Sequence, residues 1–136
     1  MAAGHPQGAG SAPSKRSIGK IGEDAAASHL EAAGWRVLQR NFRLGRYGEI
    51  DIVARRGDTV CFVEVKSRSN DRFGTPAEAV NWDKRQTIRA IASHYMATRC
   101  GPGAHARFDV VEVYFRHGED GAPSVRSINQ IEDAFQ

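Results

Sequence analysis

The sequence has little of what builds disulfide-stabilised or membrane-embedded proteins. Its two cysteines, Cys61 and Cys100, are isolated, and they lack the paired spacing of a disulfide framework or a cysteine metal site. No apolar run approaches the roughly 20 residues of a membrane span. The N-terminus lacks the apolar core of a signal peptide. We therefore expect a cytoplasmic protein with no membrane partner.

Several catalytic motifs are also missing. No glycine-rich phosphate loop follows a predicted strand, and no nucleophile elbow is present. The five histidines are scattered without ligand spacing. These absences argue against a P-loop enzyme, a serine hydrolase of the elbow type and a histidine-based metal centre.

The composition is that of one globular domain after a short tail. The chain has 136 residues, of which 40% are hydrophobic and 26% are charged. Residues 1–17 are rich in Gly, Ala, Pro and Ser and are expected to be a disordered tail, which leaves residues 18–136 as the domain. The net charge of +3 permits nucleic-acid binding. The basic residues gather in three clusters: Arg36, Arg40, Arg43 and Arg46; Lys66, Arg68 and Arg72; and Lys84, Arg85 and Arg89.

Residues 48–68, GEIDIVARRGDTVCFVEVKSR, predict a β-hairpin. Apolar and polar residues alternate on both sides of Gly57-Asp58, which is a strong short-range indication of a tight turn. A two-residue loop sets Arg56 opposite Thr59. The same register sets Asp51 opposite Glu64 and Glu49 opposite Lys66, all on one face.

Two carboxylates in direct opposition predict a metal site. Opposed Cβ atoms lie only about 5 Å apart, so Asp51 and Glu64 repel each other. A divalent cation such as Mg²⁺ relieves this repulsion, because it binds one or two carboxylates together with water and phosphate oxygens. The alternative is a solvated face with surface ion pairs. The apolar run over 60–65 argues against it, because a carboxylate inside a buried strand needs a partner.

The other elements follow from periodicity and from turn residues. The expected order is a helix over 18–33 capped by Ser17, a strand over 35–43, the hairpin, a helix over 77–98 that begins after Pro76, and strands over 107–115 and 125–131. This order predicts an α/β domain in which helices pack against a mixed sheet with a central antiparallel hairpin. Asp109 is expected to form hydrogen bonds at a strand end.

Three further charged residues have open roles. Glu23 lies at the edge of the apolar face of the first helix, where an ordinary boundary carboxylate is the simpler interpretation. Lys84 falls between Val80 and Ile88 on an apolar stripe, where it either snorkels to water or holds its ammonium near the carboxylates or a phosphate. Arg43 is either a phosphate contact or an exposed arginine at a strand end.

These motifs together resemble a known family. Asp51 followed by Glu64-Val65-Lys66 on the next strand is similar to the core of the PD-(D/E)xK nuclease superfamily. The chain more closely resembles the YraN family of small bacterial proteins, which look like Holliday-junction resolvases. The matching segments are GKIGEDAAASHLEAAGWRVLQRNFR, the hairpin, the helix with Lys84, and RFDVVEVYF. One departure is that Ile50, not proline, precedes Asp51, and the resolvase-like branch tolerates it.

The resemblance implies a restriction-endonuclease-like fold and hydrolysis of DNA phosphodiester bonds that depends on Mg²⁺ or Mn²⁺. It implies that the carboxylate of Glu23 points into the site, and it favours the functional interpretation of Lys84. The implied catalytic residues are Glu23, Asp51, Glu64 and Lys66. The implied metal ligands are Asp51, Glu64 and the Val65 carbonyl, with Glu23 acting through water or on a second ion. The implied phosphate contacts are Arg43, Arg68 and Lys84.

The expected partner is DNA, read by its shape. Nothing in the sequence resembles an element that reads bases, so branches or ends are the expected target. Resolvase-like enzymes are typically homodimers, although the sequence itself does not establish a second copy. Two alternatives stay open: a nucleic-acid-binding module without chemistry on the same fold, and a basic domain that binds another protein. Salt-sensitive DNA binding would separate the last from the others.

Overall fold

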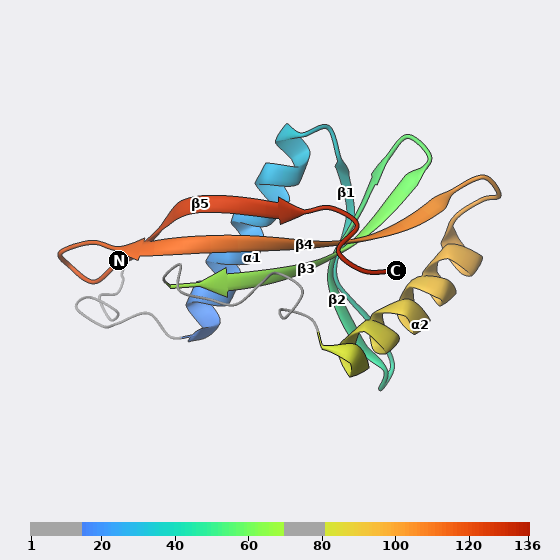
Figure 1. The fold of residues 1–136 in the computed structure, drawn as a ribbon, viewed down its shortest axis with the longest axis horizontal. Helices are drawn as coiled ribbons and strands as arrows, with labels where there is room; N and C mark the ends of the chain where they lie inside the picture. The colour runs from blue at the N-terminus through green and yellow to red at the C-terminus, as the bar shows by residue number, and fades with distance from the viewer. Residues whose placement is uncertain (1–14, 70–80) are drawn as a thin grey trace, which may run out of the picture.

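A five-stranded mixed sheet forms the centre of the computed structural model, which describes residues 15–69 and 81–136, with side chains from residue 18 onward (Figure 1). Its strands lie in the order β1-β2-β3-β4-β5, and β3 and β4 are parallel while the other neighbours are antiparallel. This is the expected α/β, restriction-endonuclease-like fold. The elements are α1 (Lys15–Ala32), β1 (Arg36–Leu44), β2 (Gly48–Arg56), β3 (Thr59–Arg68), α2 (Trp82–Arg99), β4 (His105–His117) and β5 (Pro123–Ile131).

The hairpin between β2 and β3 has the predicted register near its turn. Arg56 pairs with Thr59 and Ile52 pairs with Val63, and Gly57 adopts the positive φ of 60° that a tight two-residue turn requires. The β2–β3 ladder ends at the pair of Ile52 and Val63, so the expected pairing of Asp51 directly opposite Glu64 is wrong.

The ladder ends because the sheet divides into two arms. Beyond Ile52, β2 stays paired with β1, and β3 stays paired with β4. In Figure 1, β1 and β2 run down beside α2, while β3, β4 and β5 extend to the left across α1. The expected pairing of Glu49 with Lys66 is therefore wrong, and Glu49 pairs instead with Arg43 on β1. Asp51 is the first residue of β2 beyond the end of the β2–β3 ladder.

Each helix covers one face of the sheet. On the α2 side the buried residues are Phe42, Ile50, Val53, Val60, Phe62, Ile88, Ile91, Ala92, Tyr95, Val110 and Phe135. On the α1 side they are Ala26, Ala27, Leu30, Trp35, Ile52, Ala54, Cys61, Val63, Val111, Val113 and Phe115. Burial of these apolar side chains fixes both helices against the sheet. Neither described helix is long and apolar enough to cross a membrane.

Helix α1 begins earlier than predicted. It starts at Lys15, so Ser17 lies inside the helix and does not cap it. Lysine and arginine are good helix formers, which lets Lys15 and Arg16 extend the first turn. The predicted end is confirmed to within one residue, and Gly34 follows with a φ of 94°.

Helix α2 begins later than predicted. Asn81 is extended, and its side chain accepts a hydrogen bond of 2.8 Å from the Lys84 N–H, so Asn81 is the N-cap and α2 starts at Trp82. The expected helix from Ala77 is therefore wrong, and Lys84 lies in the first turn rather than in mid-helix. Asparagine with an acidic residue two positions later is a known helix start that the prediction overlooked. Four residues named above lie outside the described residues, namely Arg72, Pro76, Ala77 and Val80, and so do residues 1–14 of the expected tail.

Asp109 has the structural role expected of it. Its fully buried carboxylate accepts two hydrogen bonds from the Arg107 guanidinium, at 2.9 and 2.8 Å. It also accepts from the Gln130 side chain at 2.8 Å and from the Asp133 N–H at 3.0 Å. These bonds tie the start of β4 to the end of the chain, because a buried carboxylate is tolerated only when its oxygens are satisfied.

Candidate active site

Asp51 lies where the two arms of the sheet separate. Its Oδ2 accepts a hydrogen bond of 2.8 Å from the backbone N–H of Val65. The side chain thus replaces the main-chain partner that β2 no longer supplies to β3, because a backbone N–H in a buried strand needs an acceptor. The carboxylate is thereby held next to the segment that carries Glu64 and Lys66.

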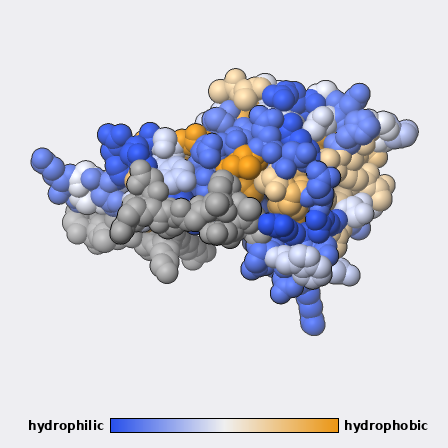
Figure 2. Space-filling model, in the orientation of Figure 1, coloured by the Kyte–Doolittle hydropathy of each residue, from blue (hydrophilic) through white to orange (hydrophobic). Residues whose placement is uncertain are grey.

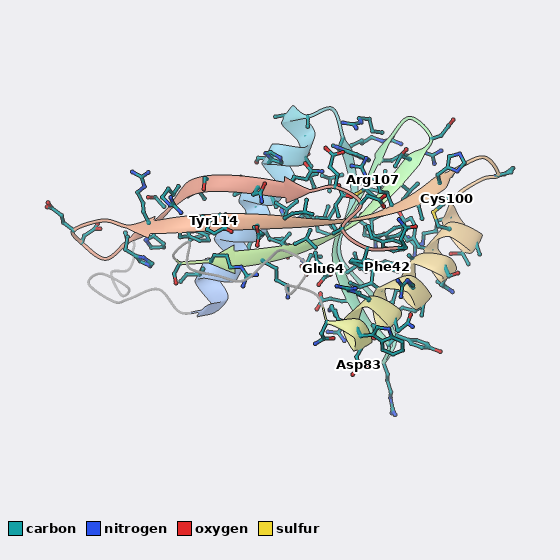
Figure 3. The ribbon with its side chains drawn as sticks, in the orientation of Figure 1. Phe42, Glu64, Asp83, Cys100, Arg107 and Tyr114 are labelled. Carbon is teal, nitrogen blue, oxygen red and sulfur yellow. The ribbon has the colours of Figure 1, made fainter. Side chains whose placement is uncertain are left out.

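Glu64 is a buried carboxylate that is only partly satisfied. It lies on β3 and is 4% exposed. Its Oε1 is 3.6 Å from the ammonium of Lys84 on α2. Its Oε2 is buried and has no hydrogen-bond partner among the described residues. A buried oxygen without a partner is costly, and it is typical of a site that binds water or an ion or that has a catalytic role. Figure 3 shows Glu64 near the centre of the molecule, where the strands cross beside α2.

Burial and charge make the ionisation of this pair unfavourable. Burial raises the pKa of Glu64 to about 7, the nearby Asp51 carboxylate raises it too, and the ammonium groups of Lys84 and Lys66 oppose the shift. Burial also raises the pKa of Asp51, against the hydrogen bond from Val65. A buried and a partly buried carboxylate that are close enough to disturb each other are the arrangement that a cation stabilises.

Glu23 approaches the same site from α1. Its carboxylate raises the pKa of Asp51, after the larger effects of burial and the Val65 hydrogen bond, which places it within electrostatic reach. Its Oε1 accepts hydrogen bonds from Arg40 at 2.9 and 3.2 Å and from the Asn41 amide at 2.9 Å. The side chain is therefore anchored to β1.

The three predicted phosphate contacts have different surroundings. Arg43 is exposed on β1 and lies 3.5 Å from Glu49. Arg68 is mostly buried, and its guanidinium lies 3.6 Å from the Glu112 carboxylate. Lys84 is next to Glu64. The structure brings Lys84 to the carboxylates, leaves Arg43 at the surface, and directs Arg68 toward another acid.

Two residues near the site have contacts that the prediction missed. Glu112 is 1% exposed, lies beside Lys66 in the β3–β4 register, and accepts hydrogen bonds from Tyr114 at 3.1 Å and Asn129 at 3.3 Å. Arg40 bridges Glu23 to Asp24, whose Oδ1 lies 2.6 Å from the guanidinium. Glu112 could have been found from the sequence, because it is an acid inside the apolar run of β4. For Arg40 the only indication was its membership of a cluster of arginines.

The carboxylate oxygens at the site fit a cation that is bound by only a few protein ligands. Among residues 15–69 and 81–136, no three His, Cys, Asp or Glu side chains converge as a metal cluster. The Oε1 of Glu23 accepts from Arg40 and Asn41, and the first candidate ligands are the carboxylates of Asp51 and Glu64. Two carboxylates with water suffice for Mg²⁺. The free, buried Oε2 of Glu64 is the observation that supports this fit.

Similarity to known proteins spans most of the chain. Residues 22–113 match a family described as "Uncharacterised protein family UPF0102". A UPF0102 protein from Syntrophus aciditrophicus (strain SB) is 48% identical over 118 residues, which are 87% of this chain and 87% of that protein. A UPF0102 protein from Acetivibrio thermocellus is 44% identical over 126 residues, or 93% and 96% of the two chains. The matched region runs from α1 into β4 and includes the four predicted catalytic residues and Lys84.

Proposed function

The chain belongs to the uncharacterised protein family UPF0102, the YraN family that its motifs resemble, and we propose that it is a metal-dependent nuclease that hydrolyses phosphodiester bonds in DNA. One observation carries the proposal: the partly buried carboxylate of Asp51 lies within electrostatic reach of the buried carboxylate of Glu64 at the division of the sheet, with Lys66 and Lys84 near Glu64. A structural core would not normally retain such a pair, because each charge is costly to bury.

Each residue of the site would have a separate role in the reaction. Asp51 and Glu64, with the Val65 carbonyl, would hold Mg²⁺ or Mn²⁺, and the bound cation would supply Lewis-acid stabilisation of the phosphate and of the attacking water. Lys66 would orient that water and offset the charge that develops in the transition state. Glu23, which Arg40 holds in position, would add a third carboxylate to the site from α1.

Basic residues around the site would hold the DNA backbone. Arg43 is exposed at the β1 edge of the site, and Lys84 is 37% exposed beside Glu64. Phosphate contacts of this kind position a duplex without reading its sequence, and they weaken as salt is added. We therefore propose selectivity for DNA shape, such as branches or ends. A homodimer would supply two such sites, as a symmetric branch requires.

A second function, a nucleic-acid-binding module without chemistry, is favoured by one pair of contacts. The ammonium of Lys84 already offsets the charge of Glu64 at 3.6 Å, and Arg40 already engages Glu23. A site whose acids are paired with protein cations can be folded without a metal ion. Under this alternative the basic surface binds DNA while the carboxylates serve only structure.

Cleavage assays distinguish the two functions. Purified protein is incubated with end-labelled linear, flapped and four-way DNA in Mg²⁺, in Mn²⁺ and in EDTA. Glu64→Ala and Lys66→Ala are prepared identically. Glu31→Ala serves as the matched control, because Glu31 is an exposed acid near the other end of α1.

We expect wild type and Glu31→Ala to cleave DNA only with a metal ion, and Glu64→Ala and Lys66→Ala to lose cleavage. Cleavage that persists in both site variants would point to a contaminating nuclease and remove the support for the proposal. Absence of cleavage on every DNA, together with salt-sensitive binding, would favour the binding module. Absence of both cleavage and binding would leave the basic protein-interaction domain.

A further inference from the structure

Two aromatic side chains stand out on the surface beside the candidate site. Tyr47 and Trp82 are each 66% exposed. Other aromatic rings are packed inside: Phe42 and Phe62 make edge contacts with Tyr95, with ring centroids 5.2 and 5.7 Å apart. Among the described residues the only other large hydrophobic side chain with high exposure is Val125, at 38%.

The two rings belong to neighbouring parts of the fold. Tyr47 lies in the turn between β1 and β2, where its N–H donates to the Leu44 carbonyl at 3.0 Å. A Cβ added to the adjacent Gly48 would lie 3.1 Å from the Thr87 methyl group of α2, so this turn packs on the helix. Trp82 is the first residue of the same helix. Figure 1 shows the turn and the start of α2 side by side at the lower edge of the molecule.

The segments that carry the two rings are continuous with elements of the candidate site. Trp82 precedes Lys84 by two residues, and the Lys84 ammonium lies 3.6 Å from Glu64. Arg43, close to the turn that carries Tyr47, lies 3.5 Å from Glu49 on the strand that also holds Asp51. Tyr47 and Trp82 therefore belong to the turn that leads into β2, which carries Asp51, and to the first turn of α2, which carries Lys84.

The surroundings of the rings are hydrophilic and contain more basic than acidic side chains. The basic residues Arg43, Arg46, Lys84 and Arg85 lie on these two segments, against the acids Glu49 and Asp83. In Figure 2 the surface over the start of α2 and the adjoining turn is blue to white. A protein interface with this much exposed aromatic area would be expected to have an apolar core.

We propose that Tyr47 and Trp82 stack on unpaired bases, and that the substrate is DNA with a single-stranded or splayed segment beside the cleaved bond. Exposed aromatic rings interleaved with cations form the usual platform for single-stranded nucleic acid, because every base offers a flat face for stacking and the cations hold the backbone. This inference rests on the proposed function and narrows its substrate class. A continuous duplex keeps its bases paired and gives the rings nothing to stack on.

The test is equilibrium binding in EDTA, so that no cleavage occurs. Fluorescence anisotropy compares a blunt duplex with the same duplex bearing an unpaired flap. The variants are Tyr47→Ala, Trp82→Ala and Trp82→Phe, with Val125→Ala as the control that removes an exposed apolar side chain from β5. Circular dichroism confirms that each variant is folded.

We expect wild type to prefer the flapped DNA. Tyr47→Ala and Trp82→Ala should each weaken flap binding by roughly fivefold or more, while blunt-duplex binding changes less than about twofold. Trp82→Phe and Val125→Ala should bind like wild type. The fluorescence of the exposed Trp82 should be quenched by flapped DNA, and this quenching should be absent from Trp82→Phe, which retains only the buried Trp35.

Equal flap binding by wild type and both alanine variants would overturn the stacking inference and leave the nuclease proposal standing. Equal losses on flap and duplex would also overturn it, because the rings would then act without regard to unpaired bases. A change in oligomeric state with unchanged DNA binding would assign the rings to a second copy of the chain. Failure of wild type to bind any DNA would instead contradict the proposed function itself.

Discussion

Asp51 and Val65 are joined across the division of the sheet by a hydrogen bond of 2.8 Å from the Val65 N–H to the Asp51 carboxylate. This contact gives one side chain two roles. It satisfies a backbone N–H that has lost its neighbouring strand, and it presents a charged group next to Glu64. The β2–β3 ladder can end here because the Asp51 carboxylate supplies the acceptor that the Val65 N–H needs.

Replacing Asp51 with asparagine separates these two roles. In Asp51→Asn the amide oxygen can still accept from Val65, while the charge that raises the pKa of Glu64 is gone. We expect the metal-free protein to gain roughly 1 kcal/mol in unfolding free energy, because the repulsion between the acids is relieved. The rise in melting temperature that Mn²⁺ causes in wild type should disappear. Thermal unfolding with and without Mn²⁺ measures both effects.

Asp51→Ala is the informative companion variant. It removes the charge and the hydrogen-bond acceptor together, so the Val65 N–H is left unsatisfied at a cost of roughly 1–3 kcal/mol. It should be less stable than Asp51→Asn. Equal melting temperatures for the two variants would show that the hydrogen bond contributes nothing to the fold.

The metal-free protein should lose stability as pH rises from about 4.5 to 7. Burial, and after it the charge of Asp51, raise the pKa of Glu64 from its ordinary 4.5 to about 7. Between these values the folded protein holds a proton that the unfolded chain releases, so the unfolding free energy falls with increasing pH. In Glu64→Gln this contribution should vanish. Urea unfolding of wild type and Glu64→Gln is measured in EDTA across this pH range. The difference between their unfolding free energies cancels the contribution of the histidines, which is the same in both proteins.

Metal binding should have the opposite pH dependence. A cation needs the deprotonated carboxylate, so Mn²⁺ affinity should rise between about pH 6 and 8. Isothermal titration calorimetry in two buffers of different ionisation enthalpy would also detect the released proton. An affinity that is constant over this range would argue that Glu64 is not a ligand.

The parts of the fold that could be predicted from the sequence are governed by local chemistry. Gly57-Asp58 and the alternation around it determine the turn and the register as far as Ile52 and Val63, because both depend on neighbouring residues alone. Glu64 could be predicted to need a partner, because an acid inside an apolar run is unusual in any buried strand. Asn81 was also a local indication, because asparagine is a favoured N-cap, but the prediction placed the start of the helix after Pro76.

The remaining features depend on distant contacts. Whether β2 follows β1 or β3 past Ile52 is decided by the twist of the whole sheet, so the end of the β2–β3 ladder before Asp51 could not be predicted from the hairpin. The contact of Arg68 with Glu112 arises from the parallel pairing of β3 with β4, with α2 between them in the chain. Glu23 and Arg40 likewise meet only when α1 packs on β1.

Close packing at Gly22 should be essential for the position of α1. A Cβ at Gly22 would displace the Ser67 hydroxyl of β3 and lie 3.5 Å from the Ser67 Cβ and 3.7 Å from the Phe115 ring, so a larger side chain would have little room one residue before Glu23. We expect Gly22→Val to destabilise the protein by roughly 1–3 kcal/mol. Gly19→Ala is the matched control, because a Cβ there meets nothing within 4 Å and helix propensity favours alanine by up to about 1 kcal/mol. Equal effects of the two changes, measured by urea unfolding, would contradict this packing argument.

Arg40 should control activity through the position of Glu23. Its Nε and Nη2 atoms both donate to Glu23, at 3.2 and 2.9 Å, and lysine cannot reproduce this two-point contact. We expect Arg40→Lys to lower the cleavage rate by roughly tenfold or more, with the Mn²⁺-dependent shift in melting temperature retained because Asp51 and Glu64 are untouched. Arg36→Lys, an exposed change on the same strand, should behave like wild type. If Arg40→Lys cleaves at the wild-type rate, the anchoring of Glu23 is structural only. If it loses the Mn²⁺ shift as well, Glu23 belongs to the metal site itself, and Arg40 holds a ligand in place.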